Sequence, residues 1–266
     1  MPVNAGAVGA VAAAVGVPIT MRALARLFPA RPAPRETALT LDELRSRYKS
    51  WEVGLGFGAL LGAVPFAFLF WLALRALAAV HAALLPPAEL VWVTAPYFWS
   101  IPATFLGLVV MFPVGGLLAR RLLADRHAEY VAYQQLKSRM DVEKVARILG
   151  TVVSLAAAVF VLLGLDWSVR ADREGLTLNR FLSIGEERHA WADVRAIRTA
   201  PALVAPNGNR VARREYVVRF SDGRSWSTNG DLSDASPAEK RRLAALIAES
   251  SGVAIEEVRI LRNDEL

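Results

Sequence analysis

The stretch from Arg147 to Phe181 reads RILGTVVSLAAAVFVLLGLD and then WSVRADREGLTLNRF, and it joins two different kinds of sequence. Its first part contains a charge-free run over residues 148–165, which is typical of a membrane-spanning helix. Its second part alternates apolar and polar residues around a turn at Asp172–Gly175, which is typical of β-strands. We therefore predict a helical membrane domain over residues 1–166 and a soluble β-domain over residues 167–266.

The composition agrees with a chain that meets both lipid and water. Hydrophobic residues make up 54% of the 266 residues, and the mean hydropathy is +0.33. The net charge is +6, and residues 1–166 hold 15 of the 31 Lys and Arg but only 10 of the 25 acids. Retention of basic loops on the cytoplasmic side of a membrane explains this excess, so no nucleic-acid partner is expected.

Three segments are apolar and long enough to cross a bilayer, which takes about 20 residues. We predict spans at 53–75, 98–119 and 148–166. The charge-free run that contains the second of these spans already begins at Leu90.

Residues 3–21 are a candidate for a fourth span. They carry no charge and consist mostly of Ala and Gly, with Pro18 near their end. The alternative is an amphipathic or membrane-surface helix that packs on the other spans through its small residues.

The distribution of basic residues predicts the topology. Lys and Arg are concentrated in residues 22–52 and 120–147, which we assign to the cytoplasm. The link between the first two spans has only His81 and Glu89 as chargeable groups, so it is expected on the opposite side. By the same rule the last span runs from the cytoplasmic side to the extracytoplasmic side. The sequence thus predicts a multi-pass protein of the inner (plasma) membrane with an extracytoplasmic C-terminal domain.

Helix starts can be located from their capping residues. Thr40 and Glu43 have the spacing of a capping box, and Asp141 is expected to cap the helix that carries the last span. Tyr48 and Trp51, on the face that leads into the membrane, are expected at headgroup depth, where amphipathic aromatic side chains accumulate.

Residues 167–266 show the short apolar runs and turn residues of an antiparallel β-domain. Hairpin turns are expected at Asp172–Gly175 and Asp222-Gly223, a strand break at Ala192-Asp193, and a loop tip at 206–209. Tyr216, Val218 and Phe220 are expected to alternate inward, and Trp191, Val194 and Ile197 recur around the strand break. Leu176 and Leu178 are expected to share one face of their strand. Arg180 and Leu182 continue the face of Leu176 and Leu178.

A helix over residues 237–251 is expected to close this domain. Ser236, Pro237 and Glu239 supply the N-cap, the first-turn proline and the capping-box acid, and Gly252 can end the helix. The final apolar and acidic stretch, VAIEEVRIL, is expected to add a strand or to dock on the domain. The buried stripe of the helix is Leu243, Leu246 and Ile247.

The order of these elements resembles the pleckstrin-homology-like (PH-like) domain that is attached to membrane spans in bacterial proteins. The resemblance covers about 167–252 and rests on the strands, the Trp191-x-Asp193-Val194 segment, the Asp222-Gly223 hairpin and the closing helix. It implies a bent β-sandwich plugged by a helix, and binding or assembly rather than catalysis. A lipid-headgroup role is not implied here, because Asp172 and Glu174 oppose the basic residues of the first hairpin.

Catalytic and cofactor sites are not expected. The chain has no cysteine, its histidines lie in no metal-ligand spacing, and it has no glycine-rich phosphate loop or nucleophile elbow. His189 and Asp193 stand four residues apart, but a turn or sheet-edge role is the simpler interpretation. We therefore expect no enzyme activity, no metal and no cofactor.

Two functional hypotheses remain. The first is a membrane protein that presents the PH-like domain for protein–protein contact or envelope assembly, with the lipid bilayer and other membrane or envelope proteins, a second copy included, as partners. The second is a small channel or transporter subunit that uses Arg75 and the proline-kinked spans. Snorkelling of Arg75 to the interface, with Glu89 as its partner, is the simpler interpretation of that residue.

Overall fold

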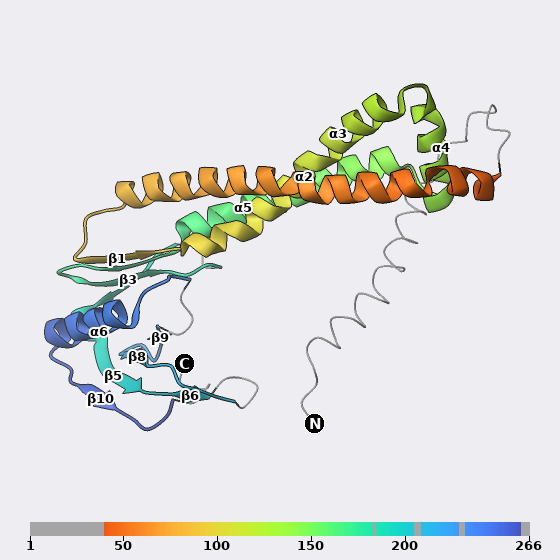
Figure 1. The fold of residues 1–266 in the computed structure, drawn as a ribbon. Helices are drawn as coiled ribbons and strands as arrows, with labels where there is room; N and C mark the ends of the chain where they lie inside the picture. The colour runs from red at the N-terminus through yellow and green to blue at the C-terminus, as the bar shows by residue number, and fades with distance from the viewer. Residues whose placement is uncertain (1–39, 183–184, 205–208, 229–231, 262–266) are drawn as a thin grey trace. The chain divides into compact units, whose positions relative to one another are not determined.

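The computed structural model describes residues 40–182, 185–204, 209–228 and 232–261 (Figure 1). The candidate span at 3–21 and most of the expected loop tip at 206–209 lie outside the described residues. The chain forms two compact units. The helical unit is Met1–Ala73 with Ser100–Val159, and the β unit is Leu74–Trp99 with Phe160–Leu266.

Three helical stretches among the described residues are long and apolar enough to cross a membrane: Leu41–Leu84, Pro96–Ser138 and Val142–Asp166. This confirms the three predicted apolar spans at the level of length and hydropathy. Their large side chains are widely exposed, as for Leu61 at 71% and Phe57 at 64%. The helices are α2 (Leu41–Leu84), α3 (Ser100–Leu123), α4 (His127–Ser138) and α5 (Val142–Asp166), with 3-10 turns η1 (Pro96–Trp99) and η2 (Ala124–Arg126).

The boundaries of the first two helices differ from the predicted spans. Helix α2 continues past residue 75 to Leu84 and ends before Pro86 and Pro87, which cannot extend a helix. The apolar run that follows does not begin as a helix, because residues Leu90–Val93 form strand β1. Their Val and Trp side chains favour a strand as strongly as they favour lipid, so hydropathy alone does not distinguish the two.

Within the helical unit, α2 and α3 approach each other through small residues. A Cβ atom built on Gly107 of α3 would lie 2.6 Å from the backbone nitrogen of Ala67 and 2.9 Å from the carbonyl oxygen of Ala63, both on α2. Only a glycine fits this contact. Such close backbone packing is the usual basis of helix association in membranes.

A tyrosine cluster closes the polar end of the helical unit. The rings of Tyr48 and Tyr133 stack with their centroids 5.9 Å apart, and Tyr130 packs on both. The side chain of Tyr48 is buried in this protein core, and its expected position at headgroup depth stays a prediction. Lys137 and the hydroxyl of Tyr133 both bind the Glu52 carboxylate, which fixes α4 to the start of α2.

Both predicted helix caps of this unit are confirmed. The Thr40 backbone N–H donates to Glu43 Oε2 at 2.7 Å, and the Glu43 N–H donates to Thr40 Oγ1 at 3.4 Å. At the start of α5, the Lys144 N–H donates to Asp141 Oδ1 at 3.1 Å.

Among its described residues, the β unit contains two four-stranded sheets, a two-stranded ribbon and a C-terminal helix (Figure 1). The first sheet has the order β1-β2-β3-β4 and the second the order β10-β5-β8-β9, while β6 pairs with β7. The strands are β1 (Leu90–Val93), β2 (Ser168–Ala171), β3 (Gly175–Asn179), β4 (Glu187–Ala190), β5 (Val194–Ala200), β6 (Leu203–Val204), β7 (Arg210–Val211), β8 (Glu215–Phe220), β9 (Ser225–Ser227) and β10 (Ile255–Glu257), with η3 (Trp191–Asp193) and α6 (Pro237–Ser251).

Strand β1 comes from the link between α2 and α3 and yet pairs with β2, which follows α5. The pairing is antiparallel, with Trp92 opposite Val169. Trp92 is buried in the same core as both sheets and α6. The β unit therefore uses residues that precede the predicted range 167–266.

The local signals of the C-terminal sequence agree with the structure. The turns at Asp172–Gly175 and Asp222-Gly223 join paired strands, and η3 separates β4 of the first sheet from β5 of the second at the predicted break. Ser236 and Glu239 form the predicted capping box of α6, and Gly252 ends the helix with a φ of +70°. The sheets are not purely antiparallel, however, because β10 from the final stretch pairs parallel with β5.

Candidate functional site

A polar cleft opens at one edge of the β unit. It has a volume of about 330 Å³, and strand β4, the turn η3 and the β8–β9 hairpin all contribute to its wall. The lining residues are Glu186, Glu187, Arg188, His189, Asp193, Ser221, Asp222 and Arg224. The cleft therefore lies where the edge strand of the first sheet meets the hairpin of the second.

His189 is the most buried chargeable residue of the cleft, at 6% exposure. It stands opposite Leu176 in the register of β3 and β4, so its side chain lies on the core face of the sheet. Its ring stacks on Phe220 of β8, with centroids 3.7 Å apart and planes 7° apart. The stacking fixes the orientation of the imidazole, because both rings are held by paired strands.

Two buried polar atoms of the cleft lack a hydrogen-bond partner among the described residues. They are His189 Nε2 and Glu187 Oε2, which lie 3.9 Å apart, too far for a direct hydrogen bond. Arg180 and Arg224 approach the Glu187 carboxylate at 3.4 Å and 3.6 Å, at ion-pair range. A buried polar group without a partner is costly, so this pair is well suited to a water or a ligand group that binds both atoms.

The opposite wall of the cleft is held by internal contacts. Ser221 Oγ donates to Asp193 Oδ1 at 3.3 Å, and the Ala190 N–H donates to Asp193 Oδ2 at 3.1 Å. Arg224 lies 3.6 Å from the Asp222 carboxylate in the same hairpin. Asp193 and Asp222 thus have hydrogen-bond partners within the wall. Glu187 has ion pairs with arginine, but its Oε2 atom and His189 Nε2 have no hydrogen-bond partner among the described residues.

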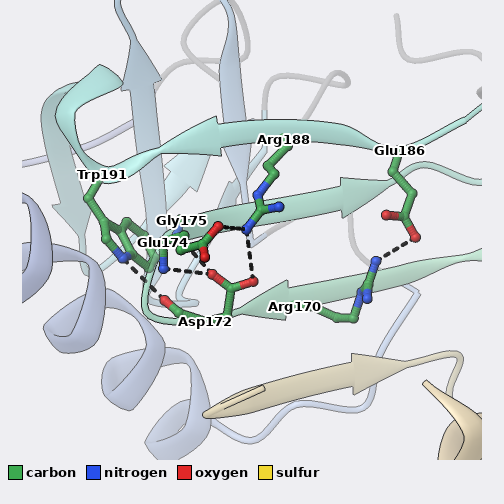
Figure 2. A network of polar contacts seen from close by, with 7 residues as sticks. All are labelled: Arg170, Asp172, Glu174, Gly175, Glu186, Arg188 and Trp191. Atoms are coloured by element: carbon green, nitrogen blue, oxygen red, sulfur yellow. Dashed lines mark hydrogen bonds and ion pairs between the residues drawn. The ribbon is translucent and has the colours of Figure 1, made fainter. Parts of the chain in front are cut away.

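The turn behind the cleft is cross-linked to β4 and η3 (Figure 2). Asp172 Oδ1 accepts from the N–H groups of Glu174 and Gly175 at 2.8 Å and 3.0 Å. Arg188 of β4 donates to Glu174 Oε2 at 2.6 Å, and the Trp191 indole N–H donates to the carbonyl oxygen of Asp172 at 3.2 Å. These bonds hold β4, and with it His189, against β3.

Gly175 is required for the close approach of β3 and β4. A Cβ atom at this position would lie 2.1 Å from the carbonyl oxygen of His189, a distance that no side chain can accept. The glycine thus sets the separation of β3 and β4 directly beside the cleft.

The charges of the first hairpin pair differently from the sequence-based expectation. Arg170 is buried and donates to Glu186 Oε1 at 2.5 Å, while Arg188 rather than Arg173 neutralises the acids of the turn (Figure 2). The expectation that this hairpin is no basic pocket still agrees with the structure, because each of these cations faces a carboxylate.

A second polar site is sealed inside the β unit. Glu215 is fully buried at the start of β8, and Lys240 of α6 lies 3.2 Å from its Oε2 atom. Thr228 Oγ1 donates to the same carboxylate at 2.5 Å, and Lys240 Nζ also donates to the Thr228 carbonyl oxygen at 2.8 Å. This network joins α6 to the second sheet and has no role in the cleft.

Neither polar site was predicted from the sequence, although one of them had a recognisable signal. Lys240 stands at helical spacing before Leu243, Ala244 and Ile247, so its position on the buried stripe could have been recognised. The cleft had no comparable signal, because β4 and the β8–β9 hairpin are far apart in the sequence. The predicted sheet-edge role of His189 agrees with its place on β4.

The structure brings no metal site together among its described residues: no three His, Asp or Glu side chains are close enough to share an ion. Arg75 is exposed on α2, nine residues before the last helical residue, Leu84. The Glu89 N–H donates to the Ala171 carbonyl oxygen at 2.9 Å, which ties the link to β2. The absence of enzyme activity and the pairing of Arg75 with Glu89 stay predictions.

Comparisons of the chain with protein-family models, with curated proteins and with solved structures find no match.

Proposed function

We propose that the chain is a multi-pass membrane protein that presents its β unit for contact with other proteins. The pairing of β1 with β2 carries this proposal. Since β1 lies between α2 and α3 and β2 follows α5, the residues that leave all three helices toward the β unit share one side of the membrane. A folded domain built on three helix ends is well anchored and open to a partner.

The charge distribution favours the extracytoplasmic side of a plasma membrane for the β unit. The link that carries β1 has only Glu89 as a charged residue after Leu84. The opposite helix ends carry basic residues, among them Arg45, Arg121 and Arg147. The preference of basic loops for the cytoplasm therefore orients the helices with β1 outward.

Single cysteines test this topology, because the chain has none of its own. A membrane-impermeant thiol reagent on intact cells is expected to label Pro87→Cys and Arg173→Cys, but to label Asp125→Cys only after permeabilisation. The reverse pattern would place the β unit in the cytoplasm. Labelling of Pro87→Cys and Arg173→Cys from different sides would contradict the proposal altogether.

A PH-like architecture of the β unit is part of the proposal. Two sheets and the capped helix α6 share one apolar core, which supports a sandwich closed by a C-terminal helix. Two elements are additions to the expected pattern: β1, which is supplied from outside the C-terminal sequence, and β10, which follows the helix.

The cleft beside β4 is the proposed contact surface. Its free hydrogen-bonding atoms on Glu187 and His189 and its charged rim at Arg224 suit a polar segment of a partner protein. A photo-crosslinking residue at Arg224 should give adducts in cells, whereas the same residue at the exposed Arg242 on α6 should give none. Equal adducts at both positions, or none at either, would refute a contact at this cleft.

A further inference from the structure

An apolar groove runs along the surface of the helical unit. It has a volume of about 400 Å³ and lies between α2 and the second half of α3. Its lining contains no charged residue: Ser50, Trp51, Gly54, Leu55, Gly58, Ala59, Met111, Gly115, Leu118 and Leu122. Such a hollow in a helix bundle leaves packing surface for one more apolar element.

Glycines on α2 and α3 give the groove its depth. A Cβ atom built on Gly54, Gly58 or Gly115 would meet no described atom within 4 Å, so the space above each is open. Gly62 continues the four-residue spacing of Gly54 and Gly58, but there Met111 of α3 already fills the space, at 2.8 Å from the Cβ position. Gly62, at one end of this row, thus packs against α3, whereas Gly54 and Gly58 at the other end have open space above them.

We propose that residues 3–21 of this chain occupy the groove as a fourth membrane helix. This segment has no charge, and as a helix it would be about 28 Å long, which matches a bilayer core of about 30 Å. Ala5, Gly9 and Ala13 recur every four residues and give it a face of small side chains. Two small-residue faces permit the close backbone approach on which helix packing in lipid depends.

The connector between this segment and α2 is long enough for the segment to reach the groove. Groove residue Ser50 lies about 14 Å along the helix from Leu41, where α2 begins. Residues 22–39 can reach about 60 Å when extended, so they span this distance easily. A tethered segment also has a high local concentration at the groove, which an untethered second copy lacks.

The charges of the connector determine the direction of the helix. Arg22 follows the segment, and Arg45 lies near the start of α2, so both ends belong on the same side of the membrane. The segment therefore runs antiparallel to α2, with Met21 level with Ser50. Because both helices rise by the same distance per residue, Ala13 is then at the same height as Ala59, to within one residue.

Disulfide cross-linking of the full chain in native membranes tests the proposal without background thiols. The pair Ala13→Cys with Ala59→Cys is expected to form an intramolecular disulfide on mild oxidation. The matched control, Ala13→Cys with Leu61→Cys, places the second thiol on the opposite, exposed face of α2 and should not cross-link.

A second pair of variants shows whether the groove itself is responsible. Gly58→Leu fills the groove and should abolish the disulfide, whereas Gly56→Leu, on an equally open glycine outside the groove, should leave it unchanged. Disulfides between two chains would show that a second copy occupies the groove. Absence of any disulfide would indicate that lipid fills the groove. Either result would overturn the proposal.

Discussion

The helical unit and the β unit place their large apolar side chains in opposite ways. Leu61 and Phe57 of α2 are mostly exposed, whereas Trp92, Trp191 and Trp226 of the β unit are buried. Their charges differ as well, since the ion pairs of the helical unit lie at its partly exposed polar end and the β unit seals Glu215 and Lys240 inside. The first unit is thus built to be solvated by lipid and the second to exclude water.

The largest effect is expected at Trp92, the residue that the link contributes to the core of the β unit. Trp92→Ala should destabilise that unit by about 3–5 kcal/mol, because it removes a buried indole and leaves a cavity. Hydrogen exchange of the β2 and β3 amides would measure the loss. Tyr97→Ala, at a residue of the same link that is 64% exposed, is the control and should change little. Equal effects would show that β1 is not part of the core.

Breaking the sealed ion pair should have a comparable or slightly smaller effect. Lys240→Met leaves the Glu215 carboxylate buried without its ammonium partner, at a cost of about 3–5 kcal/mol in the free energy of unfolding. Arg213 also contacts Glu215, but its side chain is 53% exposed, so Arg213→Met should cost no more than about 1 kcal/mol. Denaturant unfolding in detergent would compare the two variants.

The double variant Glu215→Gln with Lys240→Met separates charge from packing. It should be more stable than Lys240→Met alone, because no buried carboxylate is left without its buried ammonium partner. If the double variant is less stable than the single one, the loss comes from packing and the charge argument fails.

Glycine-to-alanine substitutions compare the two units directly. Gly175→Ala should cost about 1–3 kcal/mol, since the added Cβ atom pushes β4 away from β3. Gly56→Ala on α2 meets open space and should be neutral or stabilising. Thermal unfolding of each variant would show the contrast, and a neutral Gly175→Ala would exclude the close approach of the two strands.

The smallest effect concerns the capping box of α6 and depends on pH. The Ser236 N–H donates to the Glu239 carboxylate, and this bond lowers the pKa of Glu239 from its ordinary value of 4.5. Because the folded-state pKa is the lower one, the stabilisation is present above pH 4.5 and is lost as the pH falls through the folded pKa.

A Glu239→Gln variant tests this dependence. Its unfolding free energy should be up to about 1 kcal/mol lower than that of the natural chain at neutral pH, and the difference should shrink in acid. The measurement is denaturant unfolding at several pH values. A difference that stays constant with pH would rule out a contribution from the carboxylate charge.

Local sequence signals were sufficient for much of the fold. Thr40 with Glu43, Asp141, Ser236 with Glu239, and the Asp222-Gly223 turn each act on neighbouring residues, so their structure follows from spacing alone. The three apolar stretches could also be recognised, because lipid solvation depends on the length and hydropathy of a single segment.

Features that depend on distant residues could not be predicted in the same way. The run that begins at Leu90 looks uniformly apolar, and only the pairing with β2 shows that its first residues form a strand. The cleft requires Glu187 and His189 of β4 to meet the β8–β9 hairpin, which follows after three further strands. Sequence periodicity reports the burial of a residue within its own element, but not the identity of its neighbour.

Strand β1 also has a consequence for biosynthesis. As the ribosome releases the chain, β1 emerges well before β2, and two hydrophobic helices must be made and inserted in between. During that interval the backbone hydrogen-bonding groups of β1 have no strand to pair with, a condition in which chains mispair and aggregate. The β unit can close only after α5 has been synthesised, because β2 follows α5 in the chain.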